Sequence, residues 1–356
     1  MGADRAQRQP AVSPVRRSSR TRAQGKSLHA FVPAVSAFRR SLLRWYDANR
    51  RDLPWRRTSD PYRIWLSEIM LQQTRVAAVL EHYRVFLERF PDVASLASAP
   101  EPAVLAAWSG LGYYRRARML HQCARRIVER YSGRFPTRAD KLRDLPGIGR
   151  YTAAAIASIA FAEPVAVVDG NVQRVLERFL GCNVTPASAW DQAQRLLSPS
   201  RPGDFNQAMM ELGATVCRPR QPMCGACPVR KMCATKGEVP RTKTPALQTK
   251  RLLWCALDCR DGRIRLVQRS ERASLMPGMW ELPNWPAAGA NGSTLVQPWR
   301  TFRHSITVTD YTVHVARGTD ARNAKRDHGR WIAIGRLSEL PITGLTRKIL
   351  RADGII

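Results

Sequence analysis

Four cysteines crowded into one short segment constrain this chain more than any other feature. They lie in the stretch CRPRQPMCGACPVRKMC, which is too irregular for a long helix, and are Cys217, Cys224, Cys227 and Cys233. Four thiolates at short, uneven spacing are typical of a cage for a metal ion or an iron–sulfur cluster. A structural zinc site usually has two paired ligand motifs separated by a longer arm. Because only one such pair is present, the spacing favours an iron–sulfur cluster, with inert or disulfide-bonded cysteines as the alternative.

The charge balance indicates a polyanionic partner. The 356 residues include 58 Lys and Arg against 28 Asp and Glu, a formal net charge of +30. Each cation near a phosphate releases counterions, so this excess favours nucleic acid, with a compositional bias toward arginine as the alternative. The chain has no apolar run of the ~18 residues that a membrane-spanning helix needs.

The periodicity of apolar residues divides the chain into parts. Residues 1–30 are basic without an apolar stretch, which predicts a disordered arm, or an organellar transit peptide, rather than a secretory signal. Residues 31–235 have helical spacing, which predicts a helical domain that ends with the cysteine loop. Residues 236–250 are polar with two prolines and indicate a linker. Residues 251–356 form a β-rich domain, with strands expected at 251–258, 263–269, 305–316 and 329–334 and a closing helix at 345–352.

A glycine-containing turn predicts a phosphate-binding element. Gly147 and Gly149 lie in the segment LPGIG, between a short helix predicted at 138–144 and a second helix rich in small residues. Glycines in a tight hairpin adopt backbone angles that other residues avoid. The free N–H groups at the start of the second helix can then hold a phosphate. An ordinary helix–helix turn is the alternative.

Two carboxylates stand out by their positions. Glu68 lies on the apolar face of the helix containing WLSEIM, and no Lys or Arg lies three or four residues away. A buried carboxyl without a cation has a raised pKa, which suits a general acid, although a core glutamate bonded to backbone is the alternative. Asp169 opens the helix predicted at Gly170–Leu180, where aspartate is a favoured N-cap. A cap also fixes its carboxylate in space.

The order of motifs resembles the MutY family of the helix-hairpin-helix glycosylases. The motifs are WLSEIMLQQT, GLGYY, LPGIGRYTA, VDGNV, ELGA and the four-cysteine loop, and the resemblance covers residues 34–350. It implies a mainly α fold with two helical lobes, a 4Fe-4S cluster on the four cysteines, and an α+β C-terminal domain similar to Nudix hydrolases. The implied activity is base excision repair, the removal of adenine opposite 8-oxoguanine or guanine in duplex DNA.

The resemblance also implies residue roles. Glu68 becomes the acid that protonates N7 of the flipped adenine, and Asp169 the carboxylate that stabilises the sugar cation. Adenine leaves poorly until N7 is protonated, and the sugar then gains oxocarbenium character, so an acid and an ionised partner are both required. Tyr151 and Asn171 lie in the matching catalytic motifs. The base pocket and the wedge that opens the stack are expected from Trp55, Arg56, Leu71, Gln73, Glu211 and Tyr114, with Tyr113 as the alternative to Tyr114 and core packing as the alternative for the aromatic residues.

Lysine usage distinguishes related enzymes. A glycosylase that is also a lyase needs an amine to form a Schiff base with the sugar. In endonuclease III this lysine lies just after the hairpin, where the present chain has Tyr151, and residues 142–230 contain no lysine. We therefore expect a monofunctional enzyme that uses water. The alternatives are an endonuclease III-like glycosylase and lyase, and a non-catalytic iron–sulfur DNA-binding protein.

The C-terminal domain departs from the patterns it resembles. It lacks the REUxEExGU carboxylate helix of Nudix enzymes, so we expect it to bind rather than to hydrolyse. The family reads 8-oxoguanine with a Phe-Ser-His in a hairpin after an Arg-His, and here Thr307 aligns with the serine and Val308 with the histidine, after Arg303 and His304. We expect Thr307 and His304 to contact the lesion, with weakened discrimination. A monomer in the bacterial cytoplasm, associated with the nucleoid, is expected.

Overall fold

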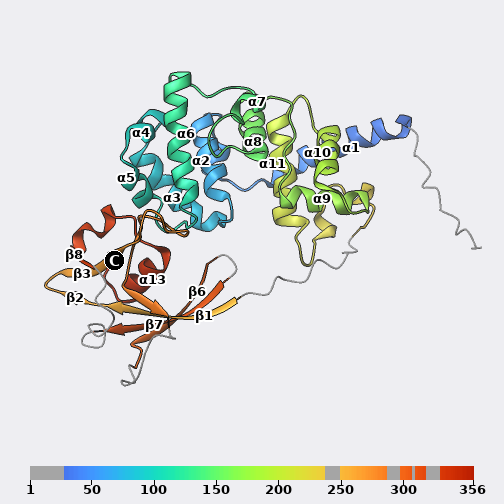
Figure 1. The fold of residues 1–356 in the computed structure, drawn as a ribbon. Coiled ribbons are helices and arrows are strands. Elements are labelled where there is room, and N and C mark those ends of the chain that lie inside the picture. Colours follow the sequence, from blue (N-terminus) through green and yellow to red (C-terminus); the bar gives the residue numbers. More distant parts are fainter. Residues whose placement is uncertain (1–27, 237–248, 287–296, 307–308, 318–328) are drawn as a thin grey trace, which may run out of the picture.

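The computed structural model describes residues 28–236, 249–286, 297–306, 309–317 and 329–356. The first of these segments is helical, and the later ones form the strands of a C-terminal domain (Figure 1). Most of the predicted arm, most of the predicted linker, and both Thr307 and Val308 lie outside the described residues. No described helix has the length and the apolar character needed to cross a membrane.

The helical domain begins at Leu28 and ends with the cysteine loop. Its elements are α1 (Leu28–Asn49), η1 (Pro54–Arg56), α2 (Pro61–Leu71), α3 (Val76–Arg89), α4 (Val93–Ser98), α5 (Glu101–Ala107), α6 (Arg115–Tyr131), α7 (Ala139–Leu142), α8 (Arg150–Phe161), α9 (Gly170–Leu180), α10 (Pro186–Leu196), α11 (Pro202–Glu211), η2 (Leu212–Val216), η3 (Cys224–Ala226) and η4 (Arg230–Met232). Side-chain caps start several of them. Asp60 accepts from the N–H of Tyr62 at α2, and Asp169 accepts from the N–H of Val172 at α9. Such caps satisfy N–H groups that the helix leaves unpaired.

Two apolar cores divide these helices into two lobes. Trp65, Phe86 and Trp108 belong to a core built mainly by α2–α6 and α8. Phe38 and Phe205 belong to a second core, built by α1 and by α9–α11. In Figure 1 the first set of helices lies on one side of the helical domain and the second set on the other. The helices therefore pack as two lobes, each around its own apolar core.

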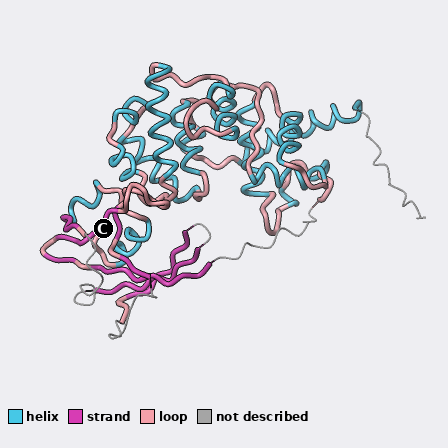
Figure 2. Tube along the Cα trace, in the orientation of Figure 1, coloured by secondary structure: helices cyan, strands magenta, loops and turns pink. Residues whose placement is uncertain are grey.

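The C-terminal domain contains two small sheets (Figure 2). Its elements are β1 (Thr249–Leu257), β2 (Cys259–Arg260), β3 (Arg263–Gln268), β4 (Trp280–Glu281), β5 (Asn284–Pro286), β6 (Arg300–Ile306), β7 (Thr309–Arg317), β8 (Arg330–Ala333), η6 (Ile334–Glu339) and α13 (Gly344–Ala352). The first sheet has the order β5-β1-β7-β6, in which β1 and β7 are parallel. In the second, β3 pairs with β2, β4 and β8. The strand predicted at 305–316 is instead divided, because β6 and β7 pair as an antiparallel hairpin.

The C-terminal domain packs directly on the helical domain. Met279 is fully buried and belongs to the same apolar core as Trp108. The carbonyl oxygen of Ile342 accepts hydrogen bonds from the hydroxyls of Ser109 at 2.9 Å and Tyr114 at 2.8 Å. Arg347 donates to the hydroxyl of Ser109 at 3.0 Å. The segment that joins α5 to α6 is therefore shared between the two domains.

Candidate active site

A cavity of about 1250 Å³ brings most of the predicted site residues together. It lies between the two lobes, and its walls come from α2, from the hairpin before α8, from the start of α9 and from the end of α11. The predicted residues that line it are Glu68, Asp169, Tyr151, Asn171, Trp55, Arg56, Leu71, Gln73, Glu211 and Gly147. Segments more than a hundred residues apart in the sequence thus supply a single pocket.

Glu68 occupies the apolar wall of this cavity. Its side chain is 8% exposed, and its Oε2 accepts a hydrogen bond of 2.8 Å from the hydroxyl of Tyr151. Burial raises the pKa of Glu68 to about 7, the bond from Tyr151 opposes this shift, and the negative charge of Asp169 adds to it. Burial favours the neutral form of a carboxyl, so the protonated form of Glu68 persists to a higher pH than that of an ordinary glutamate. That is the state a general acid requires.

Asp169 is fixed by donors on both of its oxygens. Oδ1 accepts from the backbone N–H of Val172 at 2.7 Å, and Oδ2 accepts from the amide of Asn171 at 2.9 Å. The first contact is an N-cap hydrogen bond, which holds the carboxylate at the N-terminus of α9. Asp169 can therefore cap α9 and serve as a site carboxylate in the same conformation.

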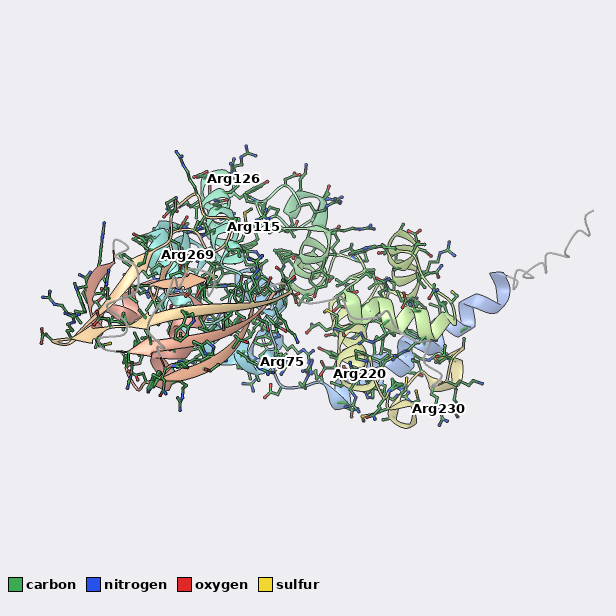
Figure 3. The ribbon with its side chains drawn as sticks, turned by 60° about the horizontal axis from the view of Figure 1, so that its bottom comes forward. Arg75, Arg115, Arg126, Arg220, Arg230 and Arg269 are labelled. Atoms are coloured by element: carbon green, nitrogen blue, oxygen red, sulfur yellow. The ribbon has the colours of Figure 1, made fainter. Side chains whose placement is uncertain are left out.

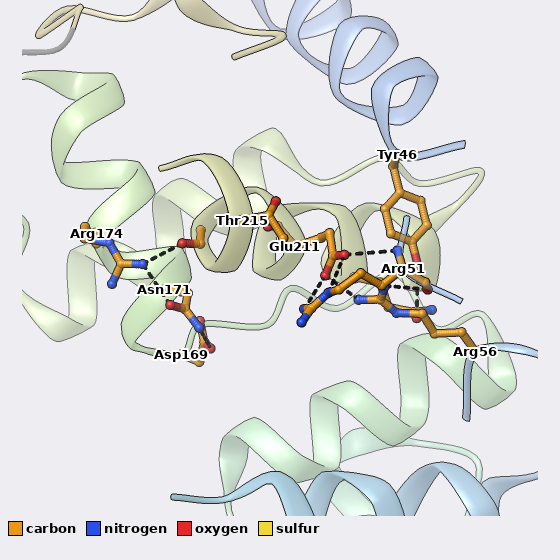
Figure 4. A network of polar contacts seen from close by, with 10 residues as sticks. Tyr46, Arg51, Arg56, Asp169, Asn171, Arg174, Glu211 and Thr215 are labelled. Atoms are coloured by element: carbon orange, nitrogen blue, oxygen red, sulfur yellow. Dashed lines mark hydrogen bonds and ion pairs between the residues drawn. The ribbon is translucent and has the colours of Figure 1, made fainter. Parts of the chain in front are cut away.

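A network behind Asp169 runs through Asn171 to Arg174 (Figure 4), and Arg174 also contacts the cysteine loop. Arg174 donates to Oδ1 of Asn171 at 2.8 Å and to the carbonyl of Gly213 at 2.8 Å. Its Nε donates to the carbonyl of Cys217 at 2.9 Å. Gly213 permits this approach, because a Cβ there would lie 2.6 Å from the Cβ of Asn171. One arginine thus joins the carboxylate support to the first cysteine.

Glu211 is held by two arginines at the other end of the cavity. Arg51 donates to both of its oxygens, at 2.8 and 2.7 Å, and Arg56 donates at 2.8 Å. Burial alone raises the pKa of Glu211, but the bonds from Arg51 and Arg56 outweigh it and lower the pKa to about 2. Glu211 is consequently ionised, in contrast to Glu68. Arg51 lies in none of the motifs, and its partner Glu211 is 160 residues away, so it was not predicted from the sequence.

The two adjacent tyrosines have opposite environments. Tyr114 is 3% exposed, does not line the cavity, and donates to the carbonyl of Ile342. Tyr113 is 49% exposed, lines the cavity and has a φ of 49°. Gln73 lines the same cavity with a φ of 58°. A buried, bonded ring does not suit a wedge, so the geometry argues against the role expected for Tyr114 and favours Tyr113.

The two hairpin glycines, Gly147 and Gly149, differ in backbone conformation and in the space around them. Gly147 has a φ of 75°, and a Cβ there would lie 2.8 Å from the Cβ of Met119. Gly149 is the N-cap of α8 with a φ of −83° and has no atom within 4 Å of the position of a Cβ. No side chain caps this helix, which leaves its first N–H groups for an anion. Gly147 therefore shapes the turn, while Gly149 leaves its outer side open.

The four cysteines surround one small cavity of about 30 Å³. All four carry free thiols, and among the described residues no three Cys, His, Asp or Glu side chains meet the geometry of a metal site. Burial raises the pKa of Cys227 to about 11, and the other three cysteines raise it further. Arg178 donates to Sγ of Cys217 at 3.3 Å and to the carbonyl of Arg218 at 2.7 Å. Four sulfurs and an N–H donor around one space fit the thiolate ligation of a cluster.

Of the two residues expected to read the lesion, the structure describes only His304, and it does not line the cavity. His304 lies in β6, is partly buried, and has a pKa that burial and Lys348 lower. Thr307 falls in the gap between β6 and β7 and is outside the described residues. The lesion-reading role of both residues therefore remains a prediction.

Basic side chains lie on several sides of the molecule. In Figure 3 the labelled Arg115 and Arg126 lie on α6, Arg75 lies beside α3, and Arg220 and Arg230 lie in the cysteine loop. This distribution agrees with a net charge of +30 that is carried along the whole chain. A charge of this size favours contact with phosphates over an extended surface.

Comparisons with known proteins agree with this geometry. Residues 66–199 match the family model of the HhH-GPD superfamily of base excision DNA repair proteins. The chain is 46% identical to the adenine DNA glycosylase of Rattus norvegicus over 255 residues, which are 67% of this chain and 49% of the rat protein. It is 49% identical to that of Homo sapiens over 230 residues, which are 60% of this chain and 42% of the human protein. The chain thus spans about half the length of these curated relatives.

Nearly the whole length of one solved structure matches this chain. A thermostable thymine-DNA glycosylase is 32% identical, with a TM-score of 0.55, and the match covers 58% of this chain and 98% of that one. The chain belongs to the MutY family within the helix-hairpin-helix superfamily of base excision DNA repair proteins. Endonuclease III in a trapped DNA complex matches at 20% identity with a TM-score of 0.51, over 60% of this chain and 98% of that one, which shows a shared fold alone. In this MutY-family chain, the superfamily match begins within α2 and ends after α10.

Proposed function

We propose that this protein is a monofunctional adenine DNA glycosylase that removes adenine opposite 8-oxoguanine or guanine in duplex DNA. The observation that carries the proposal is the contrast between Glu68 and Asp169 in one cavity. Glu68 is buried, with a pKa of about 7. Asp169 accepts two hydrogen bonds that fix its carboxylate in place. The names of the curated relatives support adenine as the base.

The chemistry follows from these two environments. A protonated Glu68 donates its proton to N7 of an adenine held in the cavity, which makes the base a better leaving group. The C–N glycosidic bond then breaks, and the sugar carbon gains positive charge. Asp169 supplies the negative charge that stabilises this cation, as in glycoside hydrolysis with two carboxyl groups. Water adds to the sugar carbon and gives one proton back to the carboxylate of Glu68, which leaves an abasic site. Tyr151, which is hydrogen-bonded to Glu68, orients it throughout.

The cavity also has the parts needed to hold an extruded base. Trp55 and Leu71 supply apolar walls, and Glu211 supplies a carboxylate that can accept from the exocyclic amine of adenine. We assign the wedge to Gln73 and Tyr113, which line the cavity with left-handed backbone conformations. Non-glycine residues in this region are strained and gather at functional sites.

The absence of a lysine supports a monofunctional reaction. Among the described residues that line the cavity there is no Lys, and Tyr151 occupies the position after the hairpin. Without an amine among these lining residues, the described part of the cavity offers no nucleophile for a Schiff base. Borohydride added during the reaction should therefore trap no covalent complex with DNA, whereas a trapped complex would favour a glycosylase and lyase.

The decisive experiment measures single-turnover release of adenine. Labelled duplexes should contain adenine opposite 8-oxoguanine, adenine opposite guanine, or thymine opposite guanine, and alkali should reveal abasic sites. We expect strand breaks with both adenine duplexes only after alkali. The thymine duplex is included because one similar structure is a thymine-DNA glycosylase. Release of thymine without release of adenine would overturn the proposal, and Glu68→Gln serves as the inactive control.

We also propose that Cys217, Cys224, Cys227 and Cys233 hold one 4Fe-4S cluster. The cluster would supply a structural cross-link for the loop, because all four ligand positions are filled by the protein. Purified protein should contain about four irons per chain and absorb broadly near 400 nm (an expectation for protein-bound 4Fe-4S clusters). Colourless protein with one equivalent of zinc would contradict this assignment.

The C-terminal domain is proposed to read the lesion without hydrolysing nucleotides. Thr307 is expected to contribute through its hydroxyl, which can donate or accept at the altered edge of 8-oxoguanine. The ratio of adenine release opposite 8-oxoguanine to that opposite guanine should fall in Thr307→Val, while release opposite guanine stays unchanged. An unchanged ratio would direct the next test to Arg303 and His304.

A further inference from the structure

Arg116 has an environment that neither the motifs nor the proposed chemistry accounts for. It lies in the first turn of α6, and its guanidinium is directed back toward the end of α2. Nη1 donates to three carbonyl oxygens there, at 2.7 Å to Ile69, 3.0 Å to Met70 and 2.5 Å to Gln72. A cation at the C-terminus of a helix interacts favourably with the helix dipole. Arg116 therefore closes the end of the helix that carries Glu68.

The other terminal nitrogen of Arg116 reaches two further segments. Nη2 donates to the hydroxyl of Thr74 at 3.2 Å, and to the carbonyls of Leu111 at 3.1 Å and Gly112 at 3.3 Å. The guanidinium also lies over the rings of Trp108, at 5.4 Å, and Tyr113, at 5.5 Å. Such cation–π contacts add attraction where the cation is removed from water. One side chain thus binds the segment after α2 and the segment before α6.

These two segments carry the pair proposed as the wedge. Gln73 lies between Gln72 and Thr74, both of which accept from Arg116. Tyr113 follows Gly112 directly, and its ring lies beneath the guanidinium. Both wedge residues have positive φ angles, of 58° and 49°. Left-handed non-glycine residues persist only where the surroundings over-determine them, and Arg116 supplies contacts on both sides.

The partial burial of the Arg116 charge is unfavourable by itself, which indicates that this side chain has a role other than stability. Burial lowers the pKa of Arg116 to about 10, and no carboxylate in the described part of the chain offsets that shift. Its Nε is buried without a hydrogen-bond partner among the described residues. A half-buried cation whose hydrogen bonds all go to carbonyl and hydroxyl oxygens, with no carboxylate partner among the described residues, is a poor choice for stability alone. Such a cation can hold several backbone segments at fixed distances, because the N–H groups of a planar guanidinium point in fixed directions.

We propose that Arg116 is a positioning residue that sets the placement of Gln73 against Tyr113 and thereby assists extrusion of the target base. This inference rests on the proposed function, because it takes the cavity to hold an extruded base. Arg116 acts before the chemical step and does not exchange a proton with the substrate. A lysine cannot replace it, because its one ammonium nitrogen cannot lie against both segments as the two terminal nitrogens of the guanidinium do.

The experiment compares paired with unpaired adenine. Arg116→Lys and Arg116→Met are assayed on a duplex with adenine opposite 8-oxoguanine, and on one with adenine opposite an abasic-site analogue. Extrusion is easier when the base has no partner. We therefore expect roughly 10-fold or greater loss with paired adenine and a loss of less than about 3-fold with unpaired adenine. Equal losses on both duplexes would show a purely structural role and overturn the proposal.

A second readout separates this inference from the proposed function. In a Glu68→Gln background, 2-aminopurine replaces the target adenine, and its fluorescence rises when it leaves the stack. Arg116→Lys should reduce that rise at saturating protein, whereas Arg125→Met, an exposed arginine on the same helix, should not. An undiminished rise overturns the positioning role. This measurement does not depend on release of the base. If the protein releases no adenine, the proposed function is refuted, while the fluorescence rise still tests the role of Arg116.

Discussion

The hydroxyl of Tyr114 donates a hydrogen bond of 2.8 Å to the carbonyl oxygen of Ile342, 228 residues away, and so joins the two domains. Tyr114→Phe removes this bond but keeps the ring. We expect the free energy of unfolding to fall by about 1 kcal/mol, since Ser109 still donates to the same carbonyl. Urea denaturation measures the change. Tyr113→Phe is the matched control and should stay within about 0.5 kcal/mol, because its ring is exposed.

The acid assignment predicts the direction of a pH profile. Glu68 has a pKa raised to about 7 and must be protonated to act. The single-turnover rate should therefore fall as the pH rises past about 7. A flat profile between pH 6 and 9 would contradict the role of Glu68 as the acid.

The same pKa shift affects stability. Between the ordinary value of 4.5 and about 7, the folded chain holds a proton that the unfolded chain has released. Stability should therefore also decrease as the pH rises through this window. Glu68→Gln has no such proton and should lose this part of the pH dependence in thermal unfolding.

Substitution of either carboxylate should slow the chemistry strongly while DNA binding persists. Glu68→Gln preserves shape but cannot deliver a proton, and Asp169→Asn preserves the cap but removes the charge. Losses of about 10²–10⁴-fold are the scale for a positioned acid. Single-turnover release and DNA binding by fluorescence anisotropy separate the two effects. Near-native release by Glu68→Gln would mean that the acid is another residue.

The support of Asp169 should be sensitive to Arg174. Arg174→Met loses donors to Asn171, Gly213 and Cys217 at once. We expect slower release of adenine, because Asn171 is then free to turn away from Asp169. Arg195→Met on α10, whose helix does not line the cavity, is the control. Equal rates for the two variants would show that this network does not position the carboxylate.

The hairpin offers a test of its two glycines. Gly147→Ala places a Cβ 2.8 Å from Met119 at a φ of 75°, and should destabilise the protein by about 1–3 kcal/mol. Gly149→Ala meets no atom within 4 Å and should leave the melting temperature nearly unchanged. Thermal unfolding of both variants checks the difference. Equally small changes of melting temperature in the two variants would show that Met119 moves and relieves the close approach at Gly147.

Local signals allowed much of the fold to be predicted. Helix α9 has the predicted bounds, Gly170–Leu180, because an aspartate cap begins it and Gly181, with a φ of 70°, ends it. The closing helix differs from its prediction by one residue at its start. Strand bounds are harder to predict, since no glycine or proline stands between β6 and β7 to mark the reversal of the chain.

Contacts between distant segments account for the rest. Adjacent tyrosines look alike in a sequence, and only the docking of Ile342 shows that Tyr114 faces the interior while Tyr113 faces the cavity. Arg51 and Arg174 were missed for a similar reason. Their partners lie about 160 and 40 residues away, and arginine is too frequent in this chain to attract notice.

The single π-helical turn η2, Leu212–Val216, separates Glu211 from Cys217, and the N–H of Cys217 bonds to the carbonyl of Leu212 at 2.7 Å. Glu211 lines the base cavity and Cys217 lines the cysteine cage, so one turn sets the angle between them. Gaining or losing one residue here would rotate one end by about 100° relative to the other. The spacing between these two residues should therefore be far less tolerant of insertion during evolution than that of any surface loop.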